Sequence, residues 1–150
     1  MKVEGLLSRP EREDPPDCEG TLDGQWSGVE VTELVHRPTL ERSLKALKER
    51  EAGREPTKPE AYFRWDRDDF LGALQKLITD KDEAKLKGGP YRKYVLIIHT
   101  DEFFLDRRAV DHFLRGAKCR SRLITDVFLG LSYEPGFGIP TFRLELTRTR

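Results

Sequence analysis

The stretch that decides the fold is PDCEGTLDGQWSGVEVTEL, residues 16–34. Asp23-Gly24 is a turn signal between two short runs of alternating polar and apolar residues, so the stretch predicts a β-hairpin. The second strand of the hairpin is the stronger one and is expected over residues 26–34. Residues 10–20 are rich in proline and acid, which favours an extended chain leading into the hairpin.

Helical spacing of apolar residues predicts three helices further along the chain. The first is expected over residues 39–51 with Thr39 as its N-cap, and residues 53–65 with their two prolines are expected to form a loop. The second starts near residues 66–68 and stops at the Gly-Gly-Pro of 88–90, and the third covers 106–115. The apolar faces that should pack on the core are Leu40, Leu44 and Leu47 in the first helix and Phe70, Leu71, Leu74, Leu77 and Ile78 in the second.

Three further strands complete the expected fold. YVLIIH, residues 94–99, is a continuous apolar run, which is the pattern of a strand covered on both faces. Two final strands are expected near residues 123–133 and 139–146, separated by the turn sequence EPGFG. The order of hairpin, helices, strand, helix and two strands predicts an α/β (α+β) fold with a mixed β-sheet core flanked by helices.

Length and composition bound the class of protein. The chain has 150 residues, of which 37% are hydrophobic and 36% charged, and this length suits a single domain spanning residues 1–150. The 27 basic and 27 acidic residues give no net charge, whereas a histone-like DNA-binding protein is strongly basic overall, so this class is excluded. No apolar run is long enough for a membrane helix, the start lacks a secretory signal, and two cysteines do not make a disulfide framework. A soluble cytoplasmic domain without membrane contact is therefore expected.

Charge is distributed unevenly along the chain. Residues 117–150 carry six basic and three acidic groups, whereas residues 1–20 carry three basic and six acidic groups. The basic side chains near the C-terminus could follow the phosphates of a nucleic acid, or they could belong to a solvated tail. They are Lys118, Arg120, Arg122, Arg143, Arg148 and Arg150.

Two carboxylates in the hairpin region are the candidates for chemistry. Asp17 precedes the first strand, and Glu30 lies between Val29 and Val31 in the middle of the second. A carboxylate in an apolar strand is costly to bury alone, and pairing it with a second carboxylate and a divalent cation such as Mg²⁺ is one solution. The alternatives are that Asp17 is a turn residue and that Glu30 faces water from an edge strand.

Histidines and further carboxylates elsewhere in the sequence do not form a metal-binding pattern. His36 and His99 have no spacing such as HExxH, so a structural role is expected for each. Asp101 and Glu102 follow the apolar strand and are expected to mark its polar end.

Lysines near the end of the second helix are the candidate positive charges. Lys81 and Lys85 are four residues apart, and Lys81 is three residues after Ile78, so both should lie beside the apolar stripe. Their stems can then pack on the sheet while the ammonium groups reach its rim. Lys76 should face solvent instead. The alternative is a solvated polar face shared with the neighbouring acidic residues.

Taken together, these segments resemble the PD-(D/E)xK (restriction-endonuclease-like) nuclease superfamily. The resemblance rests on Pro16-Asp17, the hairpin, Glu30-Val31-Thr32, the lysine-bearing helix and YVLIIHTDE, and it spans roughly residues 15–102. It is closest to small bacterial members with a PD…ExT motif. In that family an α-helix with another acidic residue often precedes the PD dipeptide, and here Glu4 is the candidate, in a helix-like stretch.

The resemblance implies a Mg²⁺-dependent (or Mn²⁺-dependent) nuclease that hydrolyses phosphodiester bonds in DNA or RNA. Asp17 and Glu30 would be catalytic metal ligands. The position of the family lysine is Thr32, which carries no charge, and some members supply the lysine from the next helix. Lys81, with Lys85 as the second choice, would take this role.

Two other classes of function remain open on the sequence. One is a catalytically inactive relative that serves as a binding or assembly module with a protein partner or as a homodimer, which Thr32 favours. The other is a scaffold protein whose carboxylates are only solvated.

Overall fold

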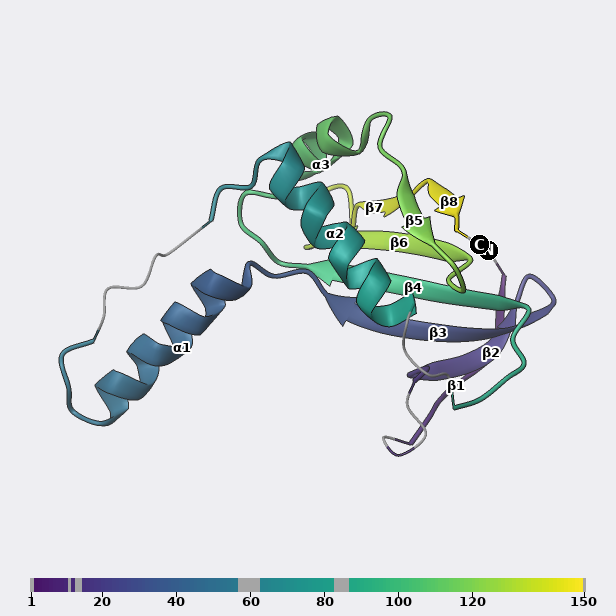
Figure 1. Cartoon of the computed structure of the whole chain (residues 1–150), viewed down its shortest axis with the longest axis horizontal. Coiled ribbons are helices and arrows are strands. Elements are labelled where there is room, and N and C mark those ends of the chain that lie inside the picture. Colours follow the sequence, from purple (N-terminus) through teal and green to yellow (C-terminus); the bar gives the residue numbers. More distant parts are fainter. Residues whose placement is uncertain (1, 11, 13–14, 57–62, 83–86, 150) are drawn as a thin grey trace.

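The computed structural model describes residues 2–10, 12, 15–56, 63–82 and 87–149. Its centre is a six-stranded mixed sheet in the order β1-β2-β3-β4-β6-β7, and a separate two-stranded sheet pairs β5 with β8 (Figure 1). The strands are β1 (Val3–Ser8), β2 (Cys18–Leu22), β3 (Gln25–Glu33), β4 (Lys93–Thr100), β5 (Cys119–Ser121), β6 (Asp126–Leu131), β7 (Thr141–Arg143) and β8 (Leu146–Arg148). The helices are α1 (Arg37–Glu51), α2 (Arg67–Asp82) and α3 (Arg107–Leu114). The expected mixed α/β class is confirmed.

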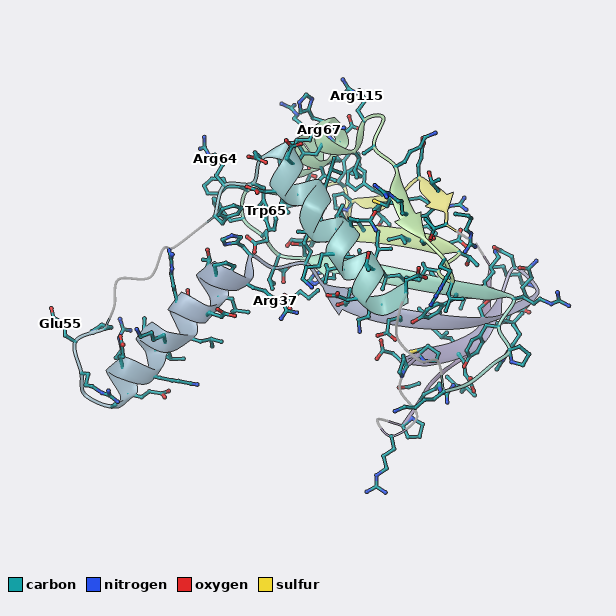
Figure 2. All side chains as sticks on the ribbon, in the orientation of Figure 1. Arg37, Glu55, Arg64, Trp65, Arg67 and Arg115 are labelled. Atoms are coloured by element: carbon teal, nitrogen blue, oxygen red, sulfur yellow. The ribbon has the colours of Figure 1, made fainter. Side chains whose placement is uncertain are left out.

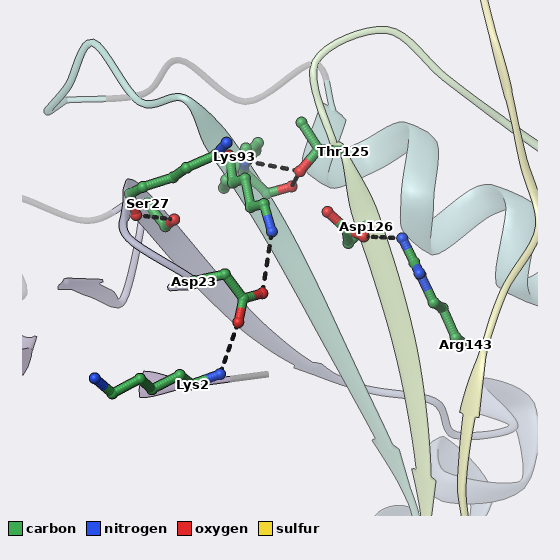
Figure 3. Close-up of polar contacts among 9 residues, drawn as sticks. Lys2, Asp23, Ser27, Lys93, Thr125, Asp126 and Arg143 are labelled. Atoms are coloured by element: carbon green, nitrogen blue, oxygen red, sulfur yellow. Dashed lines mark hydrogen bonds and ion pairs between the residues drawn. The ribbon is translucent and has the colours of Figure 1, made fainter. Parts of the chain in front are cut away.

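The predicted hairpin is formed by β2 and β3. Leu22 pairs with Gln25 across a two-residue turn, and Asp23 and Gly24 have φ angles of 50° and 76°. Two consecutive positive φ angles give the turn a twist that matches antiparallel strands, and Gly24 takes its angle without steric cost. The Asp23 carboxylate accepts a hydrogen bond of 2.7 Å from the backbone N–H of Lys2 and lies 3.4 Å from Lys93 Nζ, which together lower its pKa (Figure 3).

The centre of the sheet is parallel. β3 pairs with β4 and β4 with β6 in the same direction, so the carboxyl ends of all three lie at one edge. α2 lies across one face (Figure 1) and buries Phe70, Leu74 and Ile78 against Leu96 and Ile98. Burial of these large apolar side chains is the main stabilisation of the fold.

The opposite face of the sheet is only partly covered. Val29 and Val95 are buried there, whereas Val31 is exposed and Ile97 only half-buried. The prediction that β4 is covered on both faces was therefore wrong for the carboxyl end of the strand. The continuous apolar run of residues 94–99 could not distinguish these two environments, because a strand pattern does not say which elements pack on each face.

The beginning of α2 is hydrogen-bonded to the end of α3. The Arg67 guanidinium donates to the carbonyl oxygens of Phe113 at 3.1 Å and Arg115 at 3.4 Å, and Figure 2 shows Arg67 and Arg115 side by side. Asp66 accepts from the N–H of Asp69, and Asp106 caps α3 by accepting from Ala109. The predicted second and third helices are thus present as α2 and α3, although α2 as described ends at Asp82, before the stop predicted at residues 88–90.

The first helix differs from its prediction in two respects. α1 begins at Arg37 because His36 is the N-cap and Pro38 fits the first turn, so Thr39 lies inside the helix and bonds the His36 ring at 2.7 Å. Its leucines do not join the core: Leu40, Leu44 and Leu47 are 45%, 48% and 51% exposed. α1 extends away from the sheet (Figure 1).

The two ends of the chain also differ from the sequence-based expectation. Residues 3–8 form β1, an edge strand paired with β2, so the helix expected around Glu4 was wrong. The last two predicted strands are shorter, as β6 and β7, and the short strands β5 and β8 were missed. β5 and β8 have three residues each and pair only with one another, so neither has a local sequence pattern to reveal it.

Candidate active site

Glu30 is a buried carboxylate in the middle of the sheet. It lies on β3 between β2 and β4, pairs in register with Leu96, and is 2% exposed. The edge-strand interpretation of Glu30 was therefore wrong. A buried carboxylate requires a cation or hydrogen-bond donors, because its charge loses the hydration of water.

The cation comes from the last turn of α2. Lys81 Nζ forms a hydrogen bond and ion pair with Glu30 Oε1, and the lysine side chain is 31% exposed whereas that of Glu30 is 3% exposed. Lys81 follows the buried Ile78 by three residues, so its stem lies beside the stripe that packs on the sheet. The predicted orientation of Lys81 toward the sheet is confirmed, and Lys85 lies outside the described residues.

Asp17 reaches the same strand from the other side. Its Oδ2 accepts a hydrogen bond of 2.7 Å from the backbone N–H of Val31, the peptide group directly after Glu30. Strand pairing between β2 and β3 ends at Cys18 and Val29, so the Asp17 side chain replaces a backbone acceptor just beyond the ladder. The PD and ExT segments therefore meet at one end of β2.

A close backbone contact holds the Asp17 segment against β3. A Cβ added to Gly28 would lie 2.9 Å from Pro16 Cγ and 3.2 Å from the Tyr91 ring, so only glycine lets these side chains approach the strand. On the far side of Asp17, its carbonyl oxygen accepts from the N–H of Arg9 at 2.7 Å. Asp17 is thus positioned from both β3 and the end of β1.

A polar cluster of Arg9, Glu19 and Tyr91 supports this arrangement and was not found by sequence reasoning. Arg9 Nη1 donates to Glu19 Oε2 at 3.1 Å and lies 2.6 Å from the Tyr91 hydroxyl, which itself donates to Glu19 at 2.9 Å. Burial and the Glu19 carboxylate raise the pKa of Tyr91. Tyr91 is 82 residues from Arg9, so no local pattern could have joined them.

Cys18 is the nearest thiol to the two carboxylates. Burial raises the pKa of Cys18, and the negative charge of Asp17 raises it further. A thiol with a raised pKa is mostly protonated near neutral pH and is a poor nucleophile. Cys18 therefore reports on the charge of Asp17 rather than taking part in chemistry.

Asp17 and Glu30 carry oxygen donors of the type that a hard divalent cation prefers. Within the described ranges, no three His, Cys, Asp or Glu side chains converge as a metal-binding group, so a metal ion here would have Asp17 and Glu30 as its two carboxylate donors. Mg²⁺ is usually bound through one or two carboxylates and keeps several waters or substrate phosphate oxygens, so a two-carboxylate set suits it. Thr32 lies two residues after Glu30 and carries no charge. Lys81 is the cation that contacts Glu30.

The other candidates from the sequence have structural contacts. The His36 ring stacks on Phe63 with centroids 3.5 Å apart, and its backbone N–H donates to Glu102 at 2.6 Å. His99 Nε2 lies 3.2 Å from Asp101 Oδ1 at the end of β4. These contacts agree with the structural roles expected for these four residues.

Comparisons with protein-family models, with curated proteins and with solved structures find no match. In the part of the chain that the structure describes, none of the helices has the length and apolar character needed to cross a membrane.

Proposed function

We propose that the protein is a metal-dependent nuclease with a variant PD-(D/E)xK site. The observation that carries this proposal is the contact of Lys81 with Glu30. The next residue, Val31, donates its backbone N–H to the carboxylate of Asp17. Asp17 from the segment before β2 and Lys81 from α2 both contact β3, at Val31 and at Glu30, and this supports the proposal that the three residues act in one site. The substrate is DNA or RNA.

Each residue of the site has a distinct role in the proposed reaction. Asp17 and Glu30 would hold Mg²⁺ or Mn²⁺, which when bound activates water and stabilises the charge that develops on phosphate. Lys81 supplies the positive charge that Thr32 lacks, and its ammonium attracts the scissile phosphate or orients the attacking water. Because Lys81 is anchored on a helix packed against the sheet, this charge is positioned before substrate arrives.

The experiment is a cleavage assay on labelled single-stranded and double-stranded DNA and RNA, with Mg²⁺, Mn²⁺ or a chelator. Metal-dependent cleavage is expected from the wild type and should be lost in the Asp17→Asn and Glu30→Gln variants. These substitutions keep the shape of each side chain and remove its charge. Cleavage that persists in the Asp17→Ala, Glu30→Ala double variant overturns the proposal.

A second candidate is a catalytically inactive member that acts as a binding or assembly module. It is favoured by Thr32 in the lysine position and by Lys81 already neutralising Glu30, as an ion pair that maintains the fold would. Titration calorimetry with Mg²⁺ and Mn²⁺ separates the two candidates. A bound cation supports the nuclease, whereas no metal affinity together with a defined protein partner supports the module.

A further inference from the structure

A polar pocket lies beside α2, away from the Lys81 contact with Glu30. It has a volume of ≈ 500 Å³ and is lined by Gln75, Thr79, Asp82, Arg120, Arg122 and Thr149. Lys81 and Asp82 are consecutive in α2, so one turn of helix directs Lys81 to β3 and Asp82 to this pocket. The pocket is therefore adjacent to the candidate active site but separate from it.

Two arginines supply the charge of the pocket. Arg120 in β5 and Arg122 directly after β5 are both exposed, lie on either side of the buried Ser121, and both line the pocket. In the described part of the chain, no hydrogen bond or ion pair is formed by either guanidinium group. Arginine presents a planar fork of donors that matches phosphate oxygens.

The backbone that carries the arginines is held rigidly against α2. Gln75 donates to the Arg120 carbonyl at 3.0 Å and accepts from its N–H at 2.7 Å. Arg148 Nη1 donates to the carbonyl of Arg122 at 2.9 Å. A pre-positioned pair of cations loses less conformational entropy when an anion binds.

Asp82 is the one acid of the pocket, and its charge is already satisfied. Its carboxylate accepts from three consecutive backbone N–H groups, including those of Leu123 at 2.7 Å and Ile124 at 2.8 Å, and the residue is buried. These bonds fix the loop after Arg122 and offset the negative charge. The Thr79 and Thr149 hydroxyls and the Gln75 amide already donate to backbone carbonyls, so the two arginines are the groups that would bind an anion.

We propose that this pocket binds a phosphate of the nucleic-acid backbone next to the scissile one, and this inference rests on the proposed nuclease function. The phosphate would accept from Arg120 and Arg122. Such contacts hold the strand across the end of α2 without reading its bases. The pocket lined by Lys118, Thr125, Asp126, Arg143, Leu144, Glu145 and Leu146 is a poorer anion site, because its Arg143 is already paired with Asp126 at 2.5 Å (Figure 3).

The test measures binding rather than cleavage. A fluorescein-labelled single-stranded oligonucleotide is titrated with the Arg120→Gln, Arg122→Gln double variant in EDTA at several salt concentrations. We expect the affinity for the oligonucleotide to fall on the order of tenfold or more. The negative slope of log affinity against log salt concentration should become shallower by about 1.4, because two phosphate contacts are lost. Arg143→Gln is the control, because it removes an arginine that is already paired with Asp126. This variant should bind the oligonucleotide as the wild type does.

The outcomes separate this inference from the proposed function. Weakened binding by the double variant in a protein that never cleaves supports the pocket and contradicts the nuclease. Cleavage and binding that are unchanged by the double variant support the nuclease and overturn the pocket. Titration with inorganic phosphate distinguishes the source: arginine-dependent phosphate binding without any effect on the oligonucleotide overturns the backbone-phosphate assignment.

A second inference rests on α1 alone. Leu40, Leu44 and Leu47 form an exposed apolar stripe at coiled-coil spacing on a helix whose only buried residue is Ala46. Stripes of this kind on a protruding helix mark an interaction surface. We infer that the occupant is α1 of a second copy, in antiparallel orientation.

Charge complementarity favours self-pairing. A two-fold axis at Leu44 places Arg37 opposite Glu51 of the second copy and Glu41 beside Lys48 of the second copy. Because of the two-fold symmetry, each of these pairs of opposite charges occurs twice in the dimer. The charges beside the stripe are therefore complementary to those of a second, antiparallel copy.

Sedimentation equilibrium tests the pairing. The wild type should be a dimer, Leu44→Glu a monomer, and Leu123→Glu, at an exposed leucine outside α1, a dimer. Arg37→Glu should weaken the dimer, and adding Glu51→Arg should restore it, because the swap recreates both pairs. A monomeric wild type at every accessible concentration, or an Arg37→Glu defect that Glu51→Arg does not repair, overturns the inference.

Discussion

At the scale of single residues, the contact between Lys81 and Glu30 connects fold and proposed chemistry. A buried carboxylate and a half-buried ammonium offset each other's loss of hydration, and removing one partner leaves the other uncompensated. The same contact places a positive charge on Glu30, next to the residue whose N–H donates to Asp17. The pair therefore has both a structural and an electrostatic consequence, and the two can be separated by experiment.

Lys81→Ala should lower metal-dependent cleavage far more than Lys76→Ala does. Loss of one preorganised electrostatic group costs on the order of 10²-fold in rate, whereas Lys76 is exposed and paired only with Asp80 at 2.8 Å. Steady-state cleavage rates are measured alongside thermal unfolding, so that a folding defect is recognised. Small and equal effects of the two substitutions would show that α2 supplies no catalytic lysine.

Asp17→Asn should shift the pH dependence of Cys18 alkylation to lower pH. Burial is the larger cause of the raised Cys18 pKa and persists in the variant, but the negative charge of Asp17 is removed, so the thiolate forms more readily. Iodoacetamide rates at Cys18 are followed by peptide mass spectrometry between about pH 7 and 10, around the ordinary thiol pKa. Mg²⁺ bound to the wild type should move the profile in the same direction. An unchanged profile in Asp17→Asn would contradict an effect of the Asp17 charge on the Cys18 pKa.

At the scale of elements, the site depends on how closely the segment before β2 approaches β3. Gly28 permits this approach, because Pro16 and Tyr91 occupy the space that a side chain would need. The antiparallel pairing of β2 with β3 and the parallel pairing of β3 with β4 then fix Glu30 under the end of α2.

Gly28→Ala should destabilise the protein by about 1–3 kcal/mol, since Pro16 or the strand must move to admit the methyl group. Gly72→Ala is the matched control: Gly72 lies in α2 with nothing within 4 Å of an added Cβ, so the substitution should stabilise by up to about 1 kcal/mol. Urea unfolding measures both. A Gly28→Ala variant as stable as the wild type would show that Pro16 is not held against β3.

At the scale of the whole molecule, stability is distributed unevenly. The main core lies between α2 and the α2-facing side of β4 and β6, whereas α1 buries a single residue and extends from the sheet. Arg120 is held to this stable part by the hydrogen bonds of its backbone to Gln75 of α2, Arg122 follows it by two residues, and Lys81 belongs to α2 itself.

Hydrogen exchange should therefore be slowest in β4 and fast in α1. Amides of β4 open only with the core, whereas an isolated helix of 15 residues is marginal in water. Exchange is followed by mass spectrometry at protein concentrations too low for α1 to pair. Equal protection of α1 and β4 would show that α1 is packed within the monomer.

The sequence by itself determined the local elements. Asp23-Gly24 specified the hairpin turn, the leucine and phenylalanine spacing specified α2, and the apolar run specified β4. Lys81 could be placed beside the buried stripe from helical geometry alone, because residues three apart share a face. These are short-range effects of backbone sterics and periodicity.

Only the tertiary structure decided the rest. Burial of Glu30 depends on the pairing of β3 with β4 and on the contact with Lys81 of α2, and the cluster of Arg9 with Tyr91 joins residues 82 positions apart. The leucines of α1 have the periodicity of a core face but remain exposed, because the chain turns away from the sheet at residues 34–36. A pattern states that a face is apolar, whereas its neighbours in space depend on long-range packing, and that information is not local in the chain.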